Sequence, residues 1–393
     1  MWGLVPSQIE EVQVRSVSVV GIGQLAVKKA SELGLRQLGG EVVRRAMEDA
    51  GVDRVDALFA GNMLSDEMQG QKHIASLIAD EAKLFGVEAL QVRAAMASGA
   101  AAIRVAFLSV ASGEADLAIA VGAEKMSEGV ATPVLAKALD AKREVPDGAT
   151  MIGKNAELTR LYLNRHNVPE DGLVNFPVVA HDNARNNPFA LFQKAVSPRD
   201  VQNSRVIHAP LRLFECSPIC DGAAAIILAP SEQARVYSSH PVQILASSVV
   251  TDRFRIDDRK DPLWLEAAHR SSHDAYRKAN INREDIHLFE VHDAFSIMTC
   301  LQLEAAGFAE PGQGWRLAVE DEIRLRGQIP ITTMGGLKAR GHPIGATGLY
   351  QACEIVLQLI GRAGENQVRN AEIGMMQSVG GVASTVLTHI FGV

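Results

Sequence analysis

The stretch "QVRAAMASGAAAIRVAF", residues 91–107, decides the fold of this chain and raises its main question. A β-leaning run over residues 89–93 turns abruptly into small residues and then into an amphipathic helix. Such a turn exposes one side chain at a helix N-terminus, where free backbone N–H groups favour a negative charge. Enzymes often place a nucleophile at such an elbow. The elbow position here holds Met96, whose thioether has no proton to lose.

Length and composition predict a large α/β protein. With 393 residues, the chain exceeds the size at which one core keeps growing, so two domains or half-domains are expected. Hydrophobic residues make up 47% of the chain and aromatic residues only 5%, with 33 glycines, which is typical of closely packed helices and strands. The net charge of −7 and the lack of a basic tail argue against nucleic acid as a partner.

The expected location is the cytoplasm. The longest apolar runs are only strand-length, which predicts no membrane span. Residues 1 to about 13 are interpreted as an extension and not as a signal peptide, because they carry Glu10 and Glu11 and no continuous apolar stretch. The cysteines lack zinc-binding spacing, so free thiols and no metal site are expected. They are Cys216, Cys220, Cys300 and Cys353.

Strand patterns alternate with helical patterns, which predicts parallel βαβ units. Predicted strands cover residues 17–23, 57–61, 117–122, 223–229, 243–250, 288–291, 331–334 and 384–390. Predicted helices cover residues 35–50, 71–83, 100–111, 263–279 and 347–360. Between about 130 and 215 the alternation breaks into a polar and helical lobe.

The two halves of the chain echo each other. "VRAAMASGAAAIRVAF" has a counterpart in "TTMGGLKARGHPIGATGLYQACEIV", and "ADLAIAVGAEKM" has one in "AEIGMMQSVGGVAST". Each half is therefore predicted to repeat one βαβαβ plan, with the active site where the halves meet. The predicted boundaries are 14–240 for the N-terminal half, which includes the lobe at about 130–215, and 241–393 for the C-terminal half.

The motif "GGLKARGHPIGATG", residues 335–348, carries the most specific chemistry. Five glycines and a proline surround His342 just before a predicted helix. Glycine permits close backbone approach or positive φ, and proline suits the first turn of a helix. A histidine fixed on such a turn is placed for proton transfer or for donation to an oxyanion.

Two further turns carry polar candidates. "EVHDAF", residues 290–295, places His292 and Asp293 directly after a short buried strand, where functional groups of α/β proteins gather. Asp293 either orients His292 or caps the following helix. "SVGG", residues 378–381, places Ser378 before two glycines.

These motifs resemble those of the thiolases, and the resemblance runs from about residue 18 to residue 391. It rests on "AAMASGAA", "GHPIGATG", "DGAAA", "GNML" and "SVGG", which occur in the family's order. The "HDAF" form is most similar to the sterol-carrier-type and archaeal-type branches. The resemblance implies a five-layered α-β-α-β-α fold, a coenzyme A thioester as substrate without a further cofactor, and a homodimer or homotetramer. A zinc-ribbon/OB-fold partner protein is implied by the same branch.

The resemblance also implies roles for particular residues. His342 would activate the nucleophile, and His292 would bind a thioester oxygen through an ordered water. The nucleophilic cysteine of the family falls on Met96, and its second, acid/base cysteine falls on Ser378 or on Ala294. The remaining positions expected to bind substrate are Ser217, Gly341, Gly380 and Gly381.

Met96 leaves three explanations open. The chain is an acetyl-CoA acetyltransferase-like enzyme, for condensation or thiolysis of 3-ketoacyl-CoA, with a natural or engineered change at the nucleophile. Alternatively, it is a lyase-like relative that works on a C–C bond beside a thioester, or a non-catalytic subunit that binds acyl-CoA. The lobe, with 11 Lys/Arg against 9 Asp/Glu over residues 135–215, is expected to cover a coenzyme A channel that ends at Met96.

Overall fold

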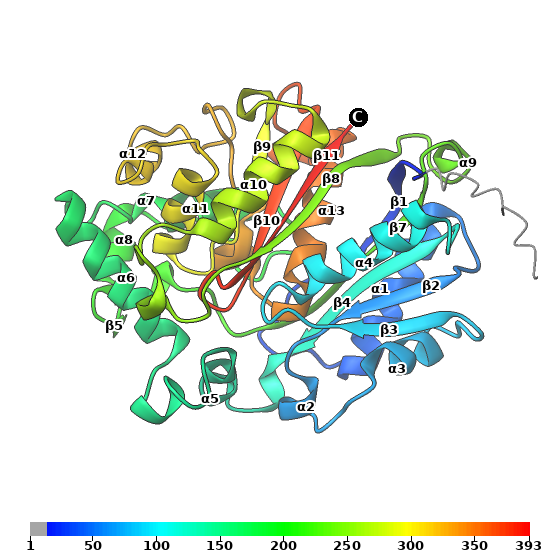
Figure 1. The fold of residues 1–393 in the computed structure, drawn as a ribbon, viewed down its shortest axis with the longest axis horizontal. Helices are drawn as coiled ribbons and strands as arrows, with labels where there is room; N and C mark the ends of the chain where they lie inside the picture. The colour runs from blue at the N-terminus through cyan, green and yellow to red at the C-terminus, as the bar shows by residue number, and fades with distance from the viewer. Residues whose placement is uncertain (1–13) are drawn as a thin grey trace, which may run out of the picture.

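A mixed sheet of nine strands runs through the molecule (Figure 1). The computed structural model describes residues 14–393, so the predicted N-terminal extension lies outside the described residues. In spatial order the strands are β3 (Glu88–Val92), β2 (Ala57–Gly61), β4 (Ala118–Lys125), β7 (Asp221–Pro230), β1 (Val17–Gln24), β8 (Val242–Thr251), β11 (Thr385–Gly392), β10 (Ile373–Gly380) and β9 (Leu288–Glu290).

The sheet consists of two halves with the same strand plan. From its centre outward, the first half runs β1, β7, β4, β2, β3, and the second runs β8, β11, β10, β9. In both halves the first two pairs are antiparallel and the outer pairs are parallel. The halves join where β1 pairs with β8, through Ser18↔Gln243 and Val19↔Val242. This repeated plan confirms the predicted pseudo-symmetric duplication.

Two strand predictions differ from the structure. The predicted strand over residues 331–334 is wrong, because Ile331 alone forms a parallel bridge to Phe289 and the chain then turns at Thr332, with φ 45°. This bridge takes the place that β3 has in the first half. Strand β10 is missing from the predicted strands, because its sequence "IGMMQSVG" combines two glycines with polar residues, a pattern atypical of strands.

Helices cover the sheet halves in five layers, as the resemblance implied. The central helices α4 (Ser98–Ser112) and α13 (Thr347–Leu359) lie against each other and against strands of both halves. The helices α1 (Leu35–Ala50) and α3 (Ile74–Glu81) cover the outside of the first half. On the outside of the second half, α10 (Glu266–Ala279) packs on β8 and β11, and α11 (Ser296–Ala305) packs beside α10.

The small residues of the opening stretch allow the two halves to meet. A Cβ added at Gly99, in α4, would lie 2.7 Å from the carbonyl oxygen of Gly345, just before α13. A Cβ added at Gly122, in β4, would lie 2.5 Å from the same oxygen. Both distances are too short for any larger residue. This close approach brings the N-terminal end of α4 next to the turn that carries His342.

The predicted lobe between β4 and β7 is mostly helical. It contains α5 (Ala131–Leu135), α6 (Met151–His166), α7 (Asn175–Ala184), α8 (Pro198–Asn203) and a hairpin of β5 (Val206–His208) and β6 (Leu211–Arg212). The remaining α-helices of the described residues are α2 (Ser65–Met68), α9 (Ala234–Tyr237) and α12 (Gly314–Val319), and a π-helical turn, η7 (Gly336–Arg340), precedes His342. Helix α7 packs directly on η7.

One described helical stretch, residues 95–112, is long and apolar enough to cross a membrane by length and composition alone. It consists of the elbow and α4. More than half of it is buried inside the protein. We therefore interpret it as the core helix of the central layer.

Candidate active site

The predicted elbow is present between β3 and α4. Ala95 adopts a φ of 50°, a left-handed conformation that costs a non-glycine residue roughly 1–2 kcal/mol. The Ser98 hydroxyl closes the turn, because its oxygen accepts from the N–H of Ala94 at 3.0 Å and its proton is donated to the carbonyl of Ala95 at 2.6 Å. The turn places Met96 two residues before α4, with its side chain almost buried.

Met96 lines a cavity of about 420 Å³ together with His342 and Ser217. The rest of its lining is mostly apolar and comes largely from the lobe and from the loop before β7. These residues are Met126, Thr132, Leu135, Thr150, Met151, Ile152, His181, Phe192, Ile207, Leu213, Phe214, Cys216, Pro218, Ile219, Ala294, Phe295, Lys338 and Ile344. The lobe therefore covers a pocket that reaches the elbow.

His342 is fixed as a neutral base. Its Nδ1 lies 2.7 Å from the hydroxyl oxygen of Thr347, and that hydroxyl lies 3.4 Å from the carbonyl of Pro343. We assign the ring proton to Nδ1, because the Thr347 hydroxyl can then accept from Nδ1–H and donate to the carbonyl, which places the lone pair on Nε2. Burial, with the nearby His292 and Arg340, lowers the pKa of His342 well below its usual value. The ring is therefore neutral, with Nε2 as its proton acceptor.

His292 lies beside His342 and outside the cavity lining. The two rings are perpendicular, with centroids 5.1 Å apart. The backbone of His292 is clamped by Gln302, which accepts from its N–H at 3.0 Å and donates to its carbonyl at 2.9 Å. Burial and the charges of Lys338 and Arg340 lower the pKa of His292 to about 3. Its Nδ1 is buried without a partner among the described residues.

Asp293 has neither of the two roles considered from the sequence. Its carboxylate accepts from the backbone N–H of Leu337 at 2.6 Å and of Lys338 at 3.3 Å, so it caps η7 and not the helix that follows it. The ammonium group of Lys338 donates to the Asp293 carbonyl at 2.7 Å. The carboxylate is thus occupied by Leu337 and Lys338 and makes no hydrogen bond to the His292 ring.

The other predicted residues support the site from outside the cavity. Ser378 is buried and donates to the side-chain oxygen of Gln351 at 2.5 Å. Gly380 packs on the elbow, since an added Cβ would lie 2.5 Å from the carbonyl of Ala94. Gly341 and Gly381 have φ values of 116° and 62°, which favour glycine. None of the four lines the cavity.

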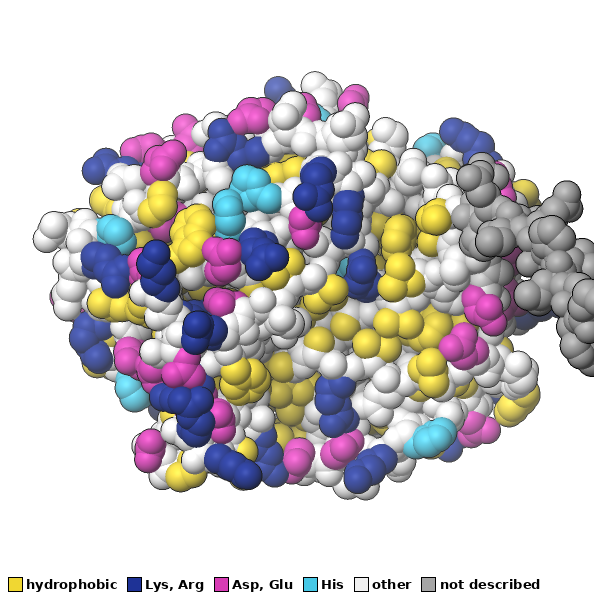
Figure 2. Space-filling model, viewed as in Figure 1, with side chains coloured by type: hydrophobic (Ala, Val, Ile, Leu, Met, Phe, Trp, Pro, Cys, Tyr) yellow, Lys and Arg dark blue, Asp and Glu magenta, His cyan; other side chains and the backbone are white. Residues whose placement is uncertain are grey.

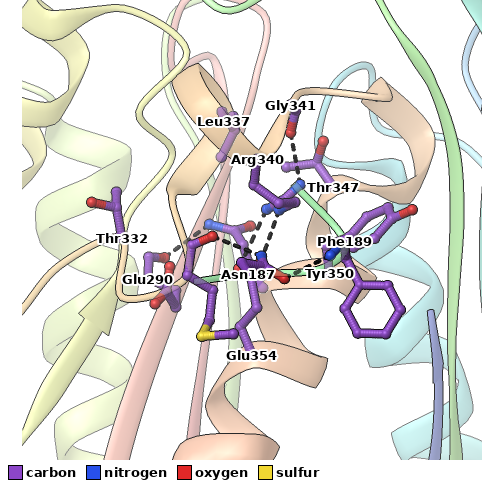
Figure 3. Close-up of polar contacts among 12 residues, drawn as sticks. Asn187, Phe189, Glu290, Thr332, Leu337, Arg340, Gly341, Thr347, Tyr350 and Glu354 are labelled. Carbon is purple, nitrogen blue, oxygen red and sulfur yellow. Dashed lines mark hydrogen bonds and ion pairs between the residues drawn. The ribbon is translucent and has the colours of Figure 1, made fainter. Parts of the chain in front are cut away.

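A buried cation holds the turn before His342 (Figure 3). Arg340 is completely buried and donates to Glu354 from Nε at 2.9 Å. Its Nη1 donates to the carbonyl of Gly341 at 2.7 Å, and its guanidinium lies 4.7 Å from the centre of the Tyr350 ring. Arg340 therefore binds to α13, and these contacts fix the path of the chain from Arg340 to His342.

A second buried carboxyl, Glu290, lies at the edge of this network and gives a pH-dependent prediction. One of its oxygens accepts from the N–H and hydroxyl of Thr333, and the other has no partner among the described residues. Burial, with the nearby Glu354, raises the pKa of Glu290 from 4.5 to about 8. Because the folded protein holds this proton more tightly, Glu290 lowers the free energy of unfolding as the pH rises from 4.5 to 8.

Glu290→Gln should remove this loss. Denaturant unfolding at several pH values is expected to show the variant gaining stability over the original protein by about 1.4 kcal/mol per pH unit within that window, with no further gain above it. A stability difference that stays constant from pH 5 to 9 would show that Glu290 keeps an ordinary pKa.

A third carboxyl joins the two halves at the site. Glu124 accepts from the backbone N–H of Met63, Leu64 and Gly345 and from the side chain of Asn62, all within 3.0 Å. Burial raises the pKa of Glu124 to about 7. It links the "GNML" turn to the "GHPIG" turn, a role that no local pattern indicated. Within residues 14–393, no three His, Cys, Asp or Glu side chains are grouped to hold a metal ion.

The repeated half-sheet plan and the elbow beside a glycine-rich histidine turn define a class of protein. Two models of protein families match the sequence and identify this class. The model "Thiolase, N-terminal domain" matches residues 16–209, and "Thiolase C-terminal domain-like" matches residues 248–393. The chain therefore belongs to the thiolase family.

Individual relatives agree with this assignment. The chain is 42% identical to an acetyl-CoA acetyltransferase of Methanothermobacter thermautotrophicus, over 96% of this chain and 100% of the relative. It is 36% identical to an acetyl-CoA acetyltransferase of Methanocaldococcus jannaschii, over 96% and 99%. It is 28% identical to the benzoylsuccinyl-CoA thiolase subunit BbsB of Thauera aromatica, over 88% and 89%. These names indicate the acyltransferase class of enzymes.

A solved structure shares the fold. The Ltp2-ChsH2(DUF35) aldolase superposes with a TM-score of 0.85 over 97% of this chain and 98% of that chain, at 23% identity.

Proposed function

We propose that this protein binds a coenzyme A thioester in the cavity beside the elbow and derives from acyltransferases of the acetyl-CoA acetyltransferase type. The observation that carries this proposal is that Met96 and His342 line one apolar cavity. The names of the archaeal relatives, at 42% and 36% identity, support the acetyl-CoA acetyltransferase type.

Met96 removes the covalent step of such an enzyme. A thiol at this position would give its proton to Nε2 of His342 and attack the thioester carbonyl, with coenzyme A thiolate as leaving group. A thioether has no proton to give, and its attack would produce an unstable acyl-sulfonium. Among the described cysteines, Cys216 lines the cavity, but burial raises the pKa of its thiol to about 12, so it supplies no thiolate.

Binding of coenzyme A tests the proposal without any chemistry. Calorimetric titration with coenzyme A is expected to show saturable binding, because the cavity is preformed and its apolar wall suits the alkyl parts of the pantetheine arm. Ile152→Asp, which places a charge in the cavity wall at α6, should weaken this binding by about tenfold or more, since a buried unpaired charge is costly. Val236→Asp on the surface of α9 is the control. Absence of binding by the original protein would contradict the proposal.

A C–C lyase acting on a 3-hydroxyacyl-CoA is the second candidate. The observation that favours it is His342, a neutral base with a free Nε2 in a cavity that lacks a thiolate. His342 would take the proton of the 3-hydroxyl group, the C2–C3 bond would break to release a carbonyl compound, and the thioester enolate would then take up a proton. Release of an aldehyde or ketone from a 3-hydroxyacyl-CoA by the original protein would favour this reading over the first.

The third candidate is a non-catalytic subunit that binds acyl-CoA. It predicts binding of coenzyme A with neither acyl transfer nor C–C bond cleavage. The aldolase that shares the fold carries a double name, Ltp2 and ChsH2(DUF35). A small zinc-ribbon/OB-fold partner for this chain stays a prediction, and co-purification of such a protein with the chain would support it.

We also propose that the protein forms a homodimer through the free edge of β3. Among residues 14–393 this strand pairs with β2 alone, and its Leu90 is 51% exposed. Leu108 on α4 and Val249 on β8 are also exposed, and Figure 2 shows hydrophobic side chains gathered over the region of α4 and β3. An unpaired strand edge with apolar side chains readily pairs with a second copy.

Sedimentation velocity tests this dimer. The original protein should sediment as a dimer, and Leu90→Asp should shift it to the monomer at micromolar concentration. Val236→Asp, at an exposed position on α9, should leave the dimer intact. A monomeric original protein would contradict the proposal.

A further inference from the structure

Lys338 is a buried cation in the wall of the active-site cavity that the chemistry proposed above does not use. Its side chain is 1% exposed. The three ammonium protons have three acceptors: the Asp293 carbonyl at 2.7 Å, the Asp293 carboxylate at 3.4 Å and the Thr299 hydroxyl at 3.2 Å. With every proton occupied, Lys338 is not a free base. It acts as a link between segments.

The segments that Lys338 links are those that carry the two histidines. Asp293 directly follows His292, and Lys338 lies four residues before His342. The contact is tight, because a Cβ added at Gly336 would lie 2.6 Å from the Asp293 carboxylate. The carboxylate therefore reaches the N–H groups of η7 only because Gly336 lacks a side chain.

We propose that Lys338, through Asp293, is a positioning residue that sets the spacing of the His292 and His342 rings in the active site. The inference rests on the proposed thioester chemistry, in which His342 is the base, and on the resemblance to the thiolases, which implies that His292 binds the thioester oxygen through a water. No hydrogen bond joins the two rings in the described part of the chain, so their perpendicular packing at 5.1 Å depends on how the two segments are held. The Asp293–Lys338 bonds join these segments close to the rings.

The charge of Lys338 also acts on His292 and favours its neutral form. Its charge adds to burial and to Arg340 in lowering the pKa of His292. The charged and titratable groups around His292 are Lys338 and Arg340 of η7, His342, and Asp293 of its own loop. A neutral His292 keeps one ring N–H donor and adds no charge beside His342.

The test uses the full chain with Met96→Cys as parent, and adds Lys338→Met or Lys338→Arg. Lys338→Met should slow acetylation at saturating acetyl-CoA by about tenfold or more while the Kd for coenzyme A changes less than about twofold, since positioning acts on the reacting geometry and not on binding. Lys338→Arg should recover most of the rate. The matched control is Lys125→Met, which breaks another buried pair of similar length, with Asp221 at 3.3 Å, and leaves the Asp293–Lys338 bonds in place.

A second readout needs no activity. The nuclear Overhauser effect between the ring protons of His292 and His342 should be present in the parent and lost in Lys338→Met. If Lys338→Met does not fold, the double variant Asp293→Asn/Lys338→Met, which removes both charges and keeps their volume, replaces it in both measurements.

The outcomes separate this proposal from the proposed function. A parent that is acetylated, with an unchanged rate and an unchanged ring contact in Lys338→Met, overturns the positioning role and leaves the function standing. A parent that is never acetylated counts against the proposed function, and the ring contact alone then decides the role of Lys338: its loss supports the proposal and its persistence overturns it.

Discussion

A variant with Met96→Cys is expected to be acetylated by acetyl-CoA and to release coenzyme A, whereas the chain with Met96 is not. The new thiol would lie at the N-terminal end of α4, which favours a thiolate, and in one cavity with the neutral His342, which can accept the thiol proton. The increase in coenzyme A release should be on the order of 10³-fold, the scale of a positioned general base. A colorimetric thiol assay on the first turnover measures it.

Two controls separate the thiol from a mere change in cavity shape. Met96→Ala shortens the side chain without adding a nucleophile and should remain inactive. His342→Ala in the Met96→Cys background should slow acetylation by roughly 10²–10⁴-fold. Thiolysis of acetoacetyl-CoA should appear more weakly than acetylation, because Ser378 and Ala294 leave the second thiol missing. A folded Met96→Cys protein that releases no coenzyme A would favour the non-catalytic reading.

The largest expected loss of stability follows from Asp221→Ala. The Asp221 carboxylate is completely buried at the start of β7 and accepts from the N–H of Ser31 at 2.8 Å, the N–H of Ser127 at 3.0 Å and the hydroxyl of Ser127 at 2.6 Å. It also pairs with the ammonium group of Lys125 at 3.3 Å. Removing it leaves the buried Lys125 cation without its nearest carboxylate and the Ser31 and Ser127 donors without their acceptor, which together cost about 3–5 kcal/mol. Urea unfolding should show this loss at neutral pH.

A surface ion pair provides the comparison. Asp66 pairs with Arg93 at 2.9 Å, but the two side chains are 26% and 41% exposed. Asp66→Ala should therefore change the free energy of unfolding by no more than about 1 kcal/mol. Equal losses for the two variants would mean that the bonds of Asp221 contribute little beyond an exposed pair.

Local patterns carried most of what the sequence predicted correctly. The elbow at Met96 follows from a strand-to-helix change over a few residues, and the helices α1, α4 and α13 lie within two residues of their predicted bounds. The duplication was visible because both halves repeat the same order of motifs. The placement of His342 before α13 follows from the glycines and the proline around it.

Long-range pairs explain what the sequence did not predict. Glu124 bonds to Gly345, which lies 221 positions away, and Asp293 bonds to Lys338, which lies 45 positions away. A short sequence pattern does not contain both partners of either bond. For the same reason the sequence suggests only neighbours of Asp293, His292 and the next helix, as its partners. The position of Ser378 behind the cavity depends on Gln351 from α13, a contact that exists only in the folded protein.

The central claim is that Met96 prevents an acyl-enzyme at an elbow whose helix N-terminus and neighbouring His342 turn are in place. Peptide mass spectrometry after incubation with acetyl-CoA tests it most directly, on the original protein and on Met96→Cys in parallel. We expect no acetylated peptide from the cavity of the original protein, and acetylation of residue 96 in the variant. Acetylation of a cavity residue in the original protein, with release of coenzyme A at ordinary enzyme rates of roughly 1–1000 per second, would contradict the claim.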